Sequence, residues 1–428
     1  MAESAFRLWK DLHGDLLTEI ARRLPCPVDR RNMLMVCHDW WLGVRQPQLP
    51  RQLPWLLLPE TTTSPVPSPC RMRRVSFYCV ISNGETHNLR IGEDTGNSRF
   101  FGCYDGGWLM LARGQTNGHM LLNLHKDQRL FLPNHVYCVA SVAMGGGVRA
   151  AMSISILAAT FSSPPERDTP CFGAAIIDSP CSTRCPQLAF WSMEVANVRP
   201  PAAMGFMETL CGSSSRLEDV IHHKGAFHFL SNLEHVVVYD ISKLKENERG
   251  TGACLGINAH HYEYLVQGGP RSSRSIRGRY LVESDGELLM VVRFVGDHPR
   301  WSPHTGGFQV YQATQSLTGA GLVQHAWTEL HSLDGRMMFV GRGCSRSYNV
   351  ADFPGSSFGE GIYFFDDRNS NDIAMMSLYA HVTPRRRYTT SDNGRCRWVE
   401  GEPRVQVFRR WFTRKKFSDY SNPMWFLP

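Results

Sequence analysis

The sequence predicts a mainly β protein in which a small helical module, residues 6–46, precedes a β-propeller over residues 75–428. Three observations lead to this fold class. Short apolar segments typical of strands recur after residue 75, many of them follow a turn that contains glycine, and helical spacing of apolar residues is clear only near the start. A repeated meander is the pattern of a propeller with blades of roughly 40–50 residues, so we expect six or seven blades.

The composition is typical of a folded protein. Apolar residues make up 42% and charged residues 20% of the 428 positions, which excludes a disordered chain. Charges interrupt every apolar run near the start, so we expect neither a secretory signal nor a membrane helix. The 13 cysteines are odd in number and irregularly spaced, so we expect reduced thiols. These features predict a protein of the cytoplasm, the nucleus or both, without a membrane partner.

The helical module is predicted to contain two short amphipathic helices. The first begins at Asp15, whose carboxylate can accept from the free N–H groups of the first turn, and it ends before Pro25. The second runs from about Val28 and ends near Gly43. Their apolar faces comprise Leu16, Leu17, Ile20, Ala21 and Leu24 in the first helix and Met33, Val36, Cys37, Trp40, Trp41 and Val44 in the second. Two helices of this size cannot bury a core alone, so they need a partner surface.

The order of residues in this module resembles an F-box, the helical module that binds a Skp-family adaptor of a cullin ubiquitin ligase. The residues that carry the resemblance are Leu12, Asp15, Leu16, Leu17, Ile20, Leu24, Asp29, Arg31, Val36, Cys37 and Trp40. The sequence departs from the family at His13, where Pro is usual, and at Trp41, where Arg is common. The resemblance implies an adaptor-binding set of Leu12, Leu16, Leu17, Ile20, Leu24, Val36, Cys37 and Trp40. The alternative is a helical hairpin packed on its own domain.

Residues 47–74 are predicted to be a linker, because their prolines disfavour regular helices and central strands. The apolar segment 53–59 inside it is expected to pack on a neighbouring domain.

From residue 75 onward the recurring unit is a strand, a turn ending in glycine and a second apolar strand. The turns expected to have positive φ angles include Lys224-Gly225, Asp285-Gly286 and Asp334-Gly335. Segments 162–184, 268–277 and 366–397 are expected to be irregular inserts. The alternative to a propeller is a β-sandwich or two smaller β domains.

A second resemblance covers most of this region. The segment 98–109, Ser-Arg-Phe-Phe-Gly-Cys-Tyr-Asp-Gly-Gly-Trp-Leu, is similar to the signature of a plant F-box family with a kelch-like propeller, long catalogued as a domain of unknown function. Segments that fit later parts of that family are 225–230, 333–341, 361–367 and 423–428. The resemblance implies a substrate receptor, in which the helices bind the adaptor and through it a cullin while the propeller recruits a protein target that the sequence does not identify.

No catalytic motif is present, so we predict no catalytic residues, no cofactor and no metal. Cys171, Cys181 and Cys185 are too widely spaced for a typical zinc site. The histidine pairs 222–223 and 260–261 are each expected to have one half-buried and one exposed ring. Asp366 and Asp367 are interpreted as turn residues rather than calcium ligands. The basic clusters 385–387 and 409–416 are interpreted as solvated strand edges or a nuclear-import signal rather than a nucleic-acid site.

The leading hypothesis is therefore a non-catalytic substrate receptor of a ubiquitin ligase. The alternative is a propeller interaction module that has lost engagement with the ligase, which His13 and Trp41 would explain. A propeller enzyme, such as a hydrolase or a copper oxidase, would need His, Tyr or carboxylates clustered around the central channel.

Overall fold

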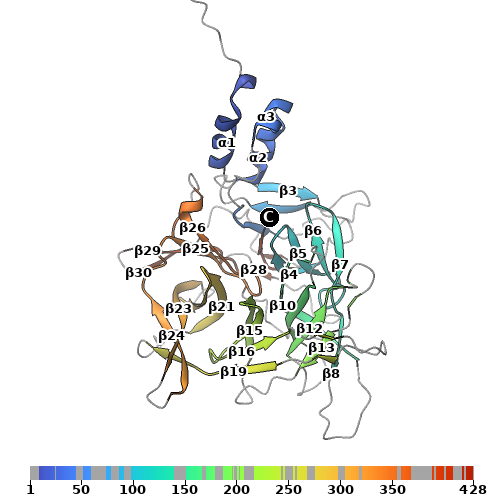
Figure 1. Cartoon of the computed structure of the whole chain (residues 1–428), viewed down its shortest axis with the longest axis vertical. Helices are drawn as coiled ribbons and strands as arrows, with labels where there is room; N and C mark the ends of the chain where they lie inside the picture. The colour runs from blue at the N-terminus through green and yellow to red at the C-terminus, as the bar shows by residue number, and fades with distance from the viewer. Residues whose placement is uncertain are drawn as a thin grey trace, which may run out of the picture.

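The computed structural model describes a mainly β protein with a small helical module at one end (Figure 1). The described residues are 9–24, 26–44, 52–58, 74–78, 86–90, 98–138, 151–165, 170–178, 187–194, 196, 200–201, 203–206, 216–241, 244–245, 254–255, 258–267, 275–296, 304–317, 321–353, 358–367, 388–389, 392–399, 402–407, 417–418 and 421–427. The helices among them are α1 (Gly14–Arg23), α2 (Pro27–Leu34) and α3 (His38–Gly43), with short 3-10 turns at Trp9–Asp11 and Val350–Asp352.

The helices differ from the prediction in two ways. The N-cap of α1 is His13 rather than Asp15, and its Nδ1 accepts from the N–H of Asp15 at 3.4 Å. Asp15 instead lies in the first turn, where its negative charge suits the helix dipole. The second predicted helix is broken, because Cys37 takes an extended conformation and becomes the N-cap of α3. Asp39 then lies in the first turn of a separate helix.

The three helices enclose a small core of their own, formed by Leu17, Ala21, Met33 and Val44. Helices α1 and α3 come close together at two glycines. A Cβ on Gly14 would lie 2.8 Å from the carbonyl oxygen of Gly43, so only a glycine permits this approach. The module is therefore a packed unit rather than a pair of loose helices.

Five sheets are blades in the sense that each is made from one continuous stretch of chain. Blade one comprises β4 (Arg99–Tyr104), β5 (Trp108–Ala112), β6 (His119–Asn123) and β7 (Gln128–Phe131); blade two comprises β8 (His135–Cys138), β9 (Ala151–Ser153), β10 (Ser155–Phe161), β11 (Phe172–Asp178), β12 (Leu188–Ser192) and β13 (Ala203–Phe206). Blade three comprises β14 (Leu217–His223), β15 (Ala226–Ser231), β16 (Val236–Asp240) and β19 (Asn258–Tyr262).

Blade four comprises β20 (Tyr264–Gln267), β21 (Ile276–Ser284), β22 (Glu287–Val295), β23 (Thr305–Leu317) and β24 (Val323–Leu330). Blade five comprises β25 (Arg336–Phe339), β26 (Arg346–Asn349), β27 (Gly361–Phe364), β29 (Gly394–Val399) and β30 (Glu402–Val407). Two small ladders pair β17 (Leu244–Lys245) with β18 (Cys254–Leu255) and β28 (Tyr388–Thr389) with β31 (Phe417–Ser418).

A further four-stranded sheet, here called the closing sheet, joins distant parts of the chain. Its order is β3 (Thr86–Arg90), β2 (Arg74–Tyr78), β1 (Trp55–Leu58) and β32 (Met424–Phe426), so β1 is paired on both sides. The expectation that residues 47–74 exclude a central strand is therefore wrong at β1. Pro54 and Pro59 flank this strand, so its four residues keep the N–H groups that the ladder needs.

The predicted count of six or seven blades is wrong, because the described residues form five blades and the closing sheet. The reason is blade length. Blades two and five span 135–206 and 336–407, which is longer than the roughly 40–50 residues assumed for one blade. The predicted insert 162–184 contains β11, a middle strand of blade two, and the predicted insert 366–397 contains β28 and the start of β29. The strand β11 was not recognised in the sequence because it contains small residues such as Gly173, which are untypical of strands. Glycine is needed at this position because a Cβ there would lie 2.2 Å from the Trp191 ring.

The glycine turns are confirmed. Both residues of Lys224-Gly225, Asp285-Gly286 and Asp334-Gly335 have positive φ angles, between 47° and 82°. This is the geometry of the tight hairpin turns that match the twist of the flanking strands.

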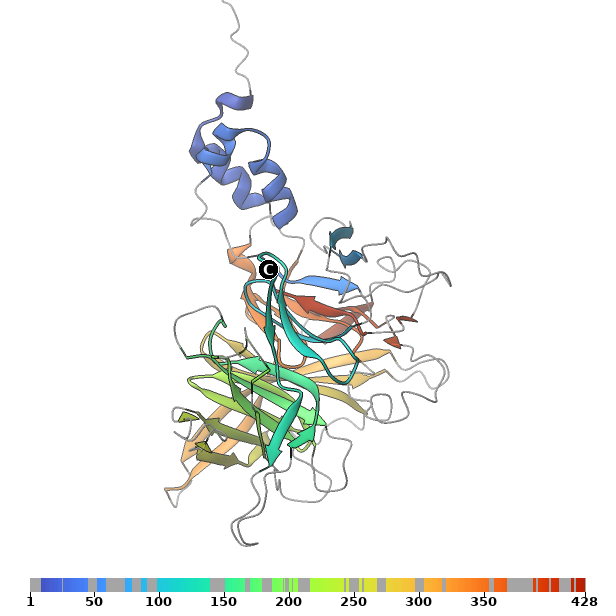
Figure 2. The ribbon, with the colours of Figure 1, turned by 90° about the vertical axis from the view of Figure 1, so that its right-hand side faces the viewer.

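Neighbouring sheets contact one another through β4, β10, β14, β21, β26 and β32, and the sheets are arranged in a ring (Figure 1). Apolar clusters fill the space between them. One of these clusters also holds Cys26, at the start of α2, together with Leu53 and Trp425. The helical module is therefore anchored on the closing sheet and projects away from the ring (Figure 2).

Candidate functional site

The structure divides the predicted adaptor-binding set between the inside and the outside of the helical module. Leu17 lies in the core of the module, and Leu12, Leu24 and Trp40 pack against that core. Cys37 is half-buried at the N-cap of α3. The exposed members are Leu16 (55%), Ile20 (38%) and Val36 (61%). Sequence reasoning could not make this division, because all eight residues have the same apolar character.

Four further large apolar residues of the module are exposed, although the predicted set did not include them: Trp9, Met35, Trp41 and Leu42. Together with Leu16, Ile20 and Val36 they form what we call the exposed apolar set. Leu16 and Ile20 are one helical turn apart, so they share a face of α1. These exposed apolar side chains make the module a candidate interaction surface.

Hydrogen bonds hold the module in one arrangement. The Arg30 guanidinium donates to the carbonyl oxygen of Leu24 at the end of α1, which fastens α1 to α2. The Trp40 indole Nε1 donates to the carbonyl oxygen of Trp9 at 3.0 Å, and Thr18 Oγ1 donates to that of Gly43 at 3.4 Å. These hydrogen bonds therefore fix the relative positions of the helices that carry the exposed apolar set.

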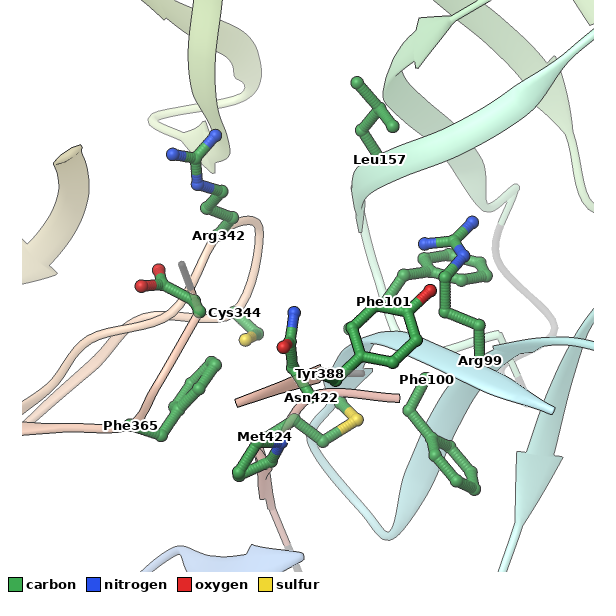
Figure 3. A pocket seen from close by; sticks show the side chains of 13 residues that line it. Arg99, Phe100, Phe101, Leu157, Arg342, Cys344, Phe365, Tyr388, Asn422 and Met424 are labelled. Carbon is green, nitrogen blue, oxygen red and sulfur yellow. The ribbon is translucent and has the colours of Figure 1, made fainter. Parts of the chain in front are cut away.

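A second candidate site is a pocket inside the ring, which includes about 480 Å³ of space, counting the part open to solvent. Its lining comes from blade one, blade two, blade five, β28 and the closing sheet: Arg99, Phe100, Phe101, Gly102, Leu157, Arg342, Cys344, Phe365, Asp367, Tyr388, Asn422, Pro423 and Met424. Figure 3 places Arg342, Cys344 and Phe365 on one side, Tyr388, Phe101 and Arg99 on the other, and Asn422 between them.

A buried charge network fixes one edge of this pocket. The guanidinium of Arg293, fully buried in β22, donates to Asp367 and to Asp392, each at 3.0 Å, and to Thr305 Oγ1 at 2.7 Å. Burial alone would lower the pKa of Arg293, but the facing Tyr280, Asp367 and Asp392 raise it above its ordinary value. Because this arginine links blade four to blade five, we interpret the network as a structural contact that holds the two blades together.

Asp219 in β14 is a second buried joint. Its carboxylate accepts from the backbone N–H groups of Gly343 at 2.6 Å, Leu281 at 2.7 Å and Val220 at 2.8 Å. Burial raises the pKa of Asp219 to about 7, against the effect of those three donors. The carboxylate thus ties blade three to blades four and five rather than facing a ligand.

Of the remaining sequence candidates, Asp367 lines the pocket, whereas the two histidine pairs lie outside both candidate sites. His222 is half-buried and His223 buried, whereas His260 and His261 are both exposed, so the expectation of one half-buried and one exposed ring in each pair is wrong. Asp366 and Asp367 are buried and hydrogen-bonded to the protein. Across the described part of the chain, no three His, Cys, Asp or Glu side chains gather as metal ligands would.

Other candidates lie partly or wholly outside the described residues. Cys171 is buried, but Cys181 and Cys185 are not among the described residues, and neither are the basic clusters 385–387 and 409–416. No helix that the structure describes has the length and apolar character needed to cross a membrane.

Comparison with known families identifies the propeller. The model of a family described as the KIB1-4 β-propeller matches residues 77–380, and the chain therefore belongs to that family. A search of curated proteins finds no match. The match runs from the end of β2 to beyond β27 in blade five, and it leaves out the helical module as well as β29, β30 and β32. The family thus establishes a β-propeller domain suited to protein interaction.

Proposed function

We propose that this KIB1-4 β-propeller protein is the substrate receptor of a Skp–cullin–F-box ubiquitin ligase. The observation that carries the proposal is the exposure of Leu16, Ile20 and Val36 on a helical module whose sequence resembles an F-box. Covering apolar side chains with a partner is favourable in water, and the helices that carry these residues project away from the ring (Figure 2).

The mechanism of such a receptor is proximity. The helices bind a Skp-family adaptor, which links them to a cullin, and the propeller holds a protein target near the ubiquitin-loaded enzyme. Tethering raises the effective concentration of the target without any catalytic residue in the receptor.

The division of the predicted set refines the roles of its residues. Leu16, Ile20 and Val36 make the adaptor contact, while Leu12, Leu17, Leu24 and Trp40 hold the module together. The departures at His13 and Trp41 are compatible with this role. His13 caps α1 in place of the usual Pro start, and Trp41 is 58% exposed, so it adds apolar area to the docking surface.

The test is retention of the purified full-length protein on an immobilised Skp-family adaptor. Full burial of a leucine side chain contributes about 1.5–3 kcal/mol, and each 1.4 kcal/mol is tenfold in Kd. We therefore expect Leu16→Asp and Ile20→Asp each to weaken binding at least tenfold. Leu265→Asp is the matched control, because Leu265 is an equally exposed leucine on the propeller, and it should bind as the wild type does.

Equal retention of wild type and Leu16→Asp would refute the docking surface. If the wild type itself is not retained, the alternative of a propeller interaction module without ligase engagement is favoured. Target proteins can then be sought by affinity purification of wild type beside a Leu16→Asp/Ile20→Asp variant. Point variants are preferable to deletion of the module, because Cys26 is part of the propeller core.

A further inference from the structure

The positive charge of this protein is concentrated near the end of the chain. Residues 385–416 contain eleven Lys and Arg against three Asp and Glu, which gives them a net charge of +8. The whole chain carries +7, so the other 396 residues together carry −1. Asp392, one of the three acids, is buried and accepts hydrogen bonds from Arg293, so it does not offset charge at the surface. Such a balance attracts an acidic partner.

The three described arginines of this segment lie on one face of β29 and β30. Arg395 and Arg397 are two residues apart on β29, and side chains at that spacing point to the same side of a sheet. Arg404 of β30 is directly opposite Arg397 in the antiparallel pair. The Cβ atoms of directly opposite residues are about 4.5–5.5 Å apart, so two like charges there destabilise the sheet. Glu402 shares this face and can offset one of the three positive charges.

Arg395 and Arg397 differ from the arginines that link the blades, because no described acid faces them. Arg279 and Arg293 each form ion pairs with two carboxylates. Arg395 instead donates from Nε to the amide oxygen of Gln406 at 2.9 Å, and neither it nor Arg397 forms an ion pair with a residue that the structure describes. Burial and the positive charge of Arg397 lower the pKa of Arg395. Within the described residues these two half-buried cations therefore lack a compensating anion.

The arginine face is turned away from blade four. On the opposite face of the same strands, Cys396, Trp398 and Val405 belong to or pack against the apolar cluster that blades four and five share. Strands β29 and β30 are the last two in the order of blade five, and they lie at the rim of the ring (Figure 1). Arg404 is exposed, and Arg395 and Arg397 are half-buried, so all three present part of their surface to solvent.

We propose that this face of blade five binds a phosphorylated segment of a protein, with the phosphoryl group between Arg397 and Arg404. A phosphoryl group carries a charge of about −1.5 to −2 at neutral pH and three acceptor oxygens, so one group can accept from both guanidinium forks. A carboxylate carries one charge, so it would leave one of the two opposed arginines uncompensated. Arg395 adds attraction from the next position on the face. The inference rests on the proposed function only in treating this segment as part of the target.

Isothermal titration of the full-length protein tests this chemistry with the peptide Ala-Ala-phosphoserine-Ala-Ala as the probe. The same peptide with serine removes the charge, and the same peptide with glutamate replaces the dianion by a carboxylate. We expect the phosphopeptide to bind at least tenfold more tightly than either control, and less tightly at high salt. Binding of the serine or the glutamate peptide as tight as that of the phosphopeptide, or no binding of the phosphopeptide, would overturn the proposal. No adaptor is present, so this result and the adaptor test can fail independently.

Variants then locate the site. Arg397→Gln and Arg404→Gln should each weaken binding of the phosphopeptide at least tenfold, whereas Arg216→Gln, at an exposed arginine before β14, should leave it unchanged. Thermal unfolding checks that each variant is folded, and Arg404 is exposed, so its replacement should not disturb the sheet. Undiminished binding by the folded Arg404→Gln variant would contradict the assignment.

A nucleic acid also carries phosphoryl groups, and a mixed-sequence single-stranded oligonucleotide tests that partner on the same protein. We expect it to bind more weakly than the phosphopeptide, because the three arginines offer room for one phosphoryl group, whereas a nucleic-acid site needs several such contacts. Tighter binding of the oligonucleotide, lost in Arg404→Gln, would overturn the proposal in favour of a nucleic-acid site.

Discussion

The helical module and the propeller place their side chains in opposite ways. The module exposes large apolar residues, such as Leu16 and Trp41, whereas the propeller buries charged ones, such as Arg293 and Asp219. Both arrangements cost free energy in an isolated chain unless a partner compensates them. In the propeller the partners are present within the chain. In the module the described residues do not cover these side chains, which is why we propose that the module binds another protein.

Several buried arginines of the propeller join neighbouring blades. Arg99 links blade one to blade two, Arg279 links blade four to Glu234 of blade three at 2.9 Å, and Arg293 links blade four to blade five. A more exposed pair completes the series, because the half-buried Arg346 of blade five pairs with the exposed Asp105 of blade one at 2.8 Å. Apolar packing alone would hold the sheets together with little directional preference, and these arginines add a fixed geometry at the joints.

The largest expected effect comes from breaking a joint. Arg293→Met leaves Asp367 and Asp392 buried with less compensation, so we expect a loss of about 3–5 kcal/mol in the free energy of unfolding, measured by urea denaturation. Arg404→Met, at an exposed arginine, should change it by less than about 0.5 kcal/mol. Adding Asp367→Asn to Arg293→Met should recover part of the loss. If Arg293→Met unfolds like the wild type, the joints do not stabilise the ring.

The next largest effect distinguishes the buried residues of the helical module from its exposed residues. Leu17→Ala opens a cavity in the module core and should cost about 2–5 kcal/mol there, which accelerates amide hydrogen exchange of α1 about 30-fold or more. Leu16→Ala, one position earlier and exposed, should leave that exchange within about twofold of the wild type. Similar exchange in the two variants would mean that burial does not distinguish these neighbours.

A smaller effect concerns pH. His119 is buried, its Nδ1 lies 2.9 Å from the carbonyl oxygen of Pro133, and its Nε2 accepts from the N–H of Ile156 at 3.3 Å. The ring is therefore neutral, and burial, with Arg99 nearby, lowers the pKa of His119 from 6.5 to about 3. Because the unfolded chain takes up the proton first, stability is full above pH 6.5 and falls as the pH is lowered towards 3.

The contribution of His119 to this loss should reach about 2 kcal/mol at pH 5. It is measured as the difference in unfolding free energy between wild type and His119→Gln, which should shrink by that amount between pH 8 and pH 5. A difference that is constant or grows on acidification would show that His119 is not held neutral.

Local signals in the sequence predicted the local structure well. The strand–turn–strand units around Gly225, Gly286 and Gly335 were recognised because two residues decide a tight turn. The strand β1 was missed because prolines at both ends obscured four residues that have no local reason to pair. They pair with β2 on one side and, on the other, with β32 from the far end of the described chain, and no local pattern carries that information.

The candidate sites were predicted less completely for the same reason. The bridge from Arg293 to Asp367 and Asp392 joins residues 74 and 99 positions apart, and the pocket brings Arg342 near Asn422 only once the ring is assembled. In the helical module the apolar residues were identified, but their division into core and surface depends on how α1 crosses α3. The spacing had predicted one continuous helix, but the extended conformation of Cys37 ends it and begins α3 as a separate helix.

The closing sheet gives this protein a built-in order of assembly. During synthesis β1, β2 and β3 emerge long before β32, so β1 must wait for its second neighbour until the rest of the ring has been made. The helices sit on the same apolar cluster as Leu53 and Trp425, so the surface that anchors them is finished only at that final pairing. A nascent or prematurely terminated chain that lacks β32 would therefore have helices without the complete apolar cluster that anchors them. The pairing of β32 with β1 thus completes both the ring and the surface that anchors the helical module.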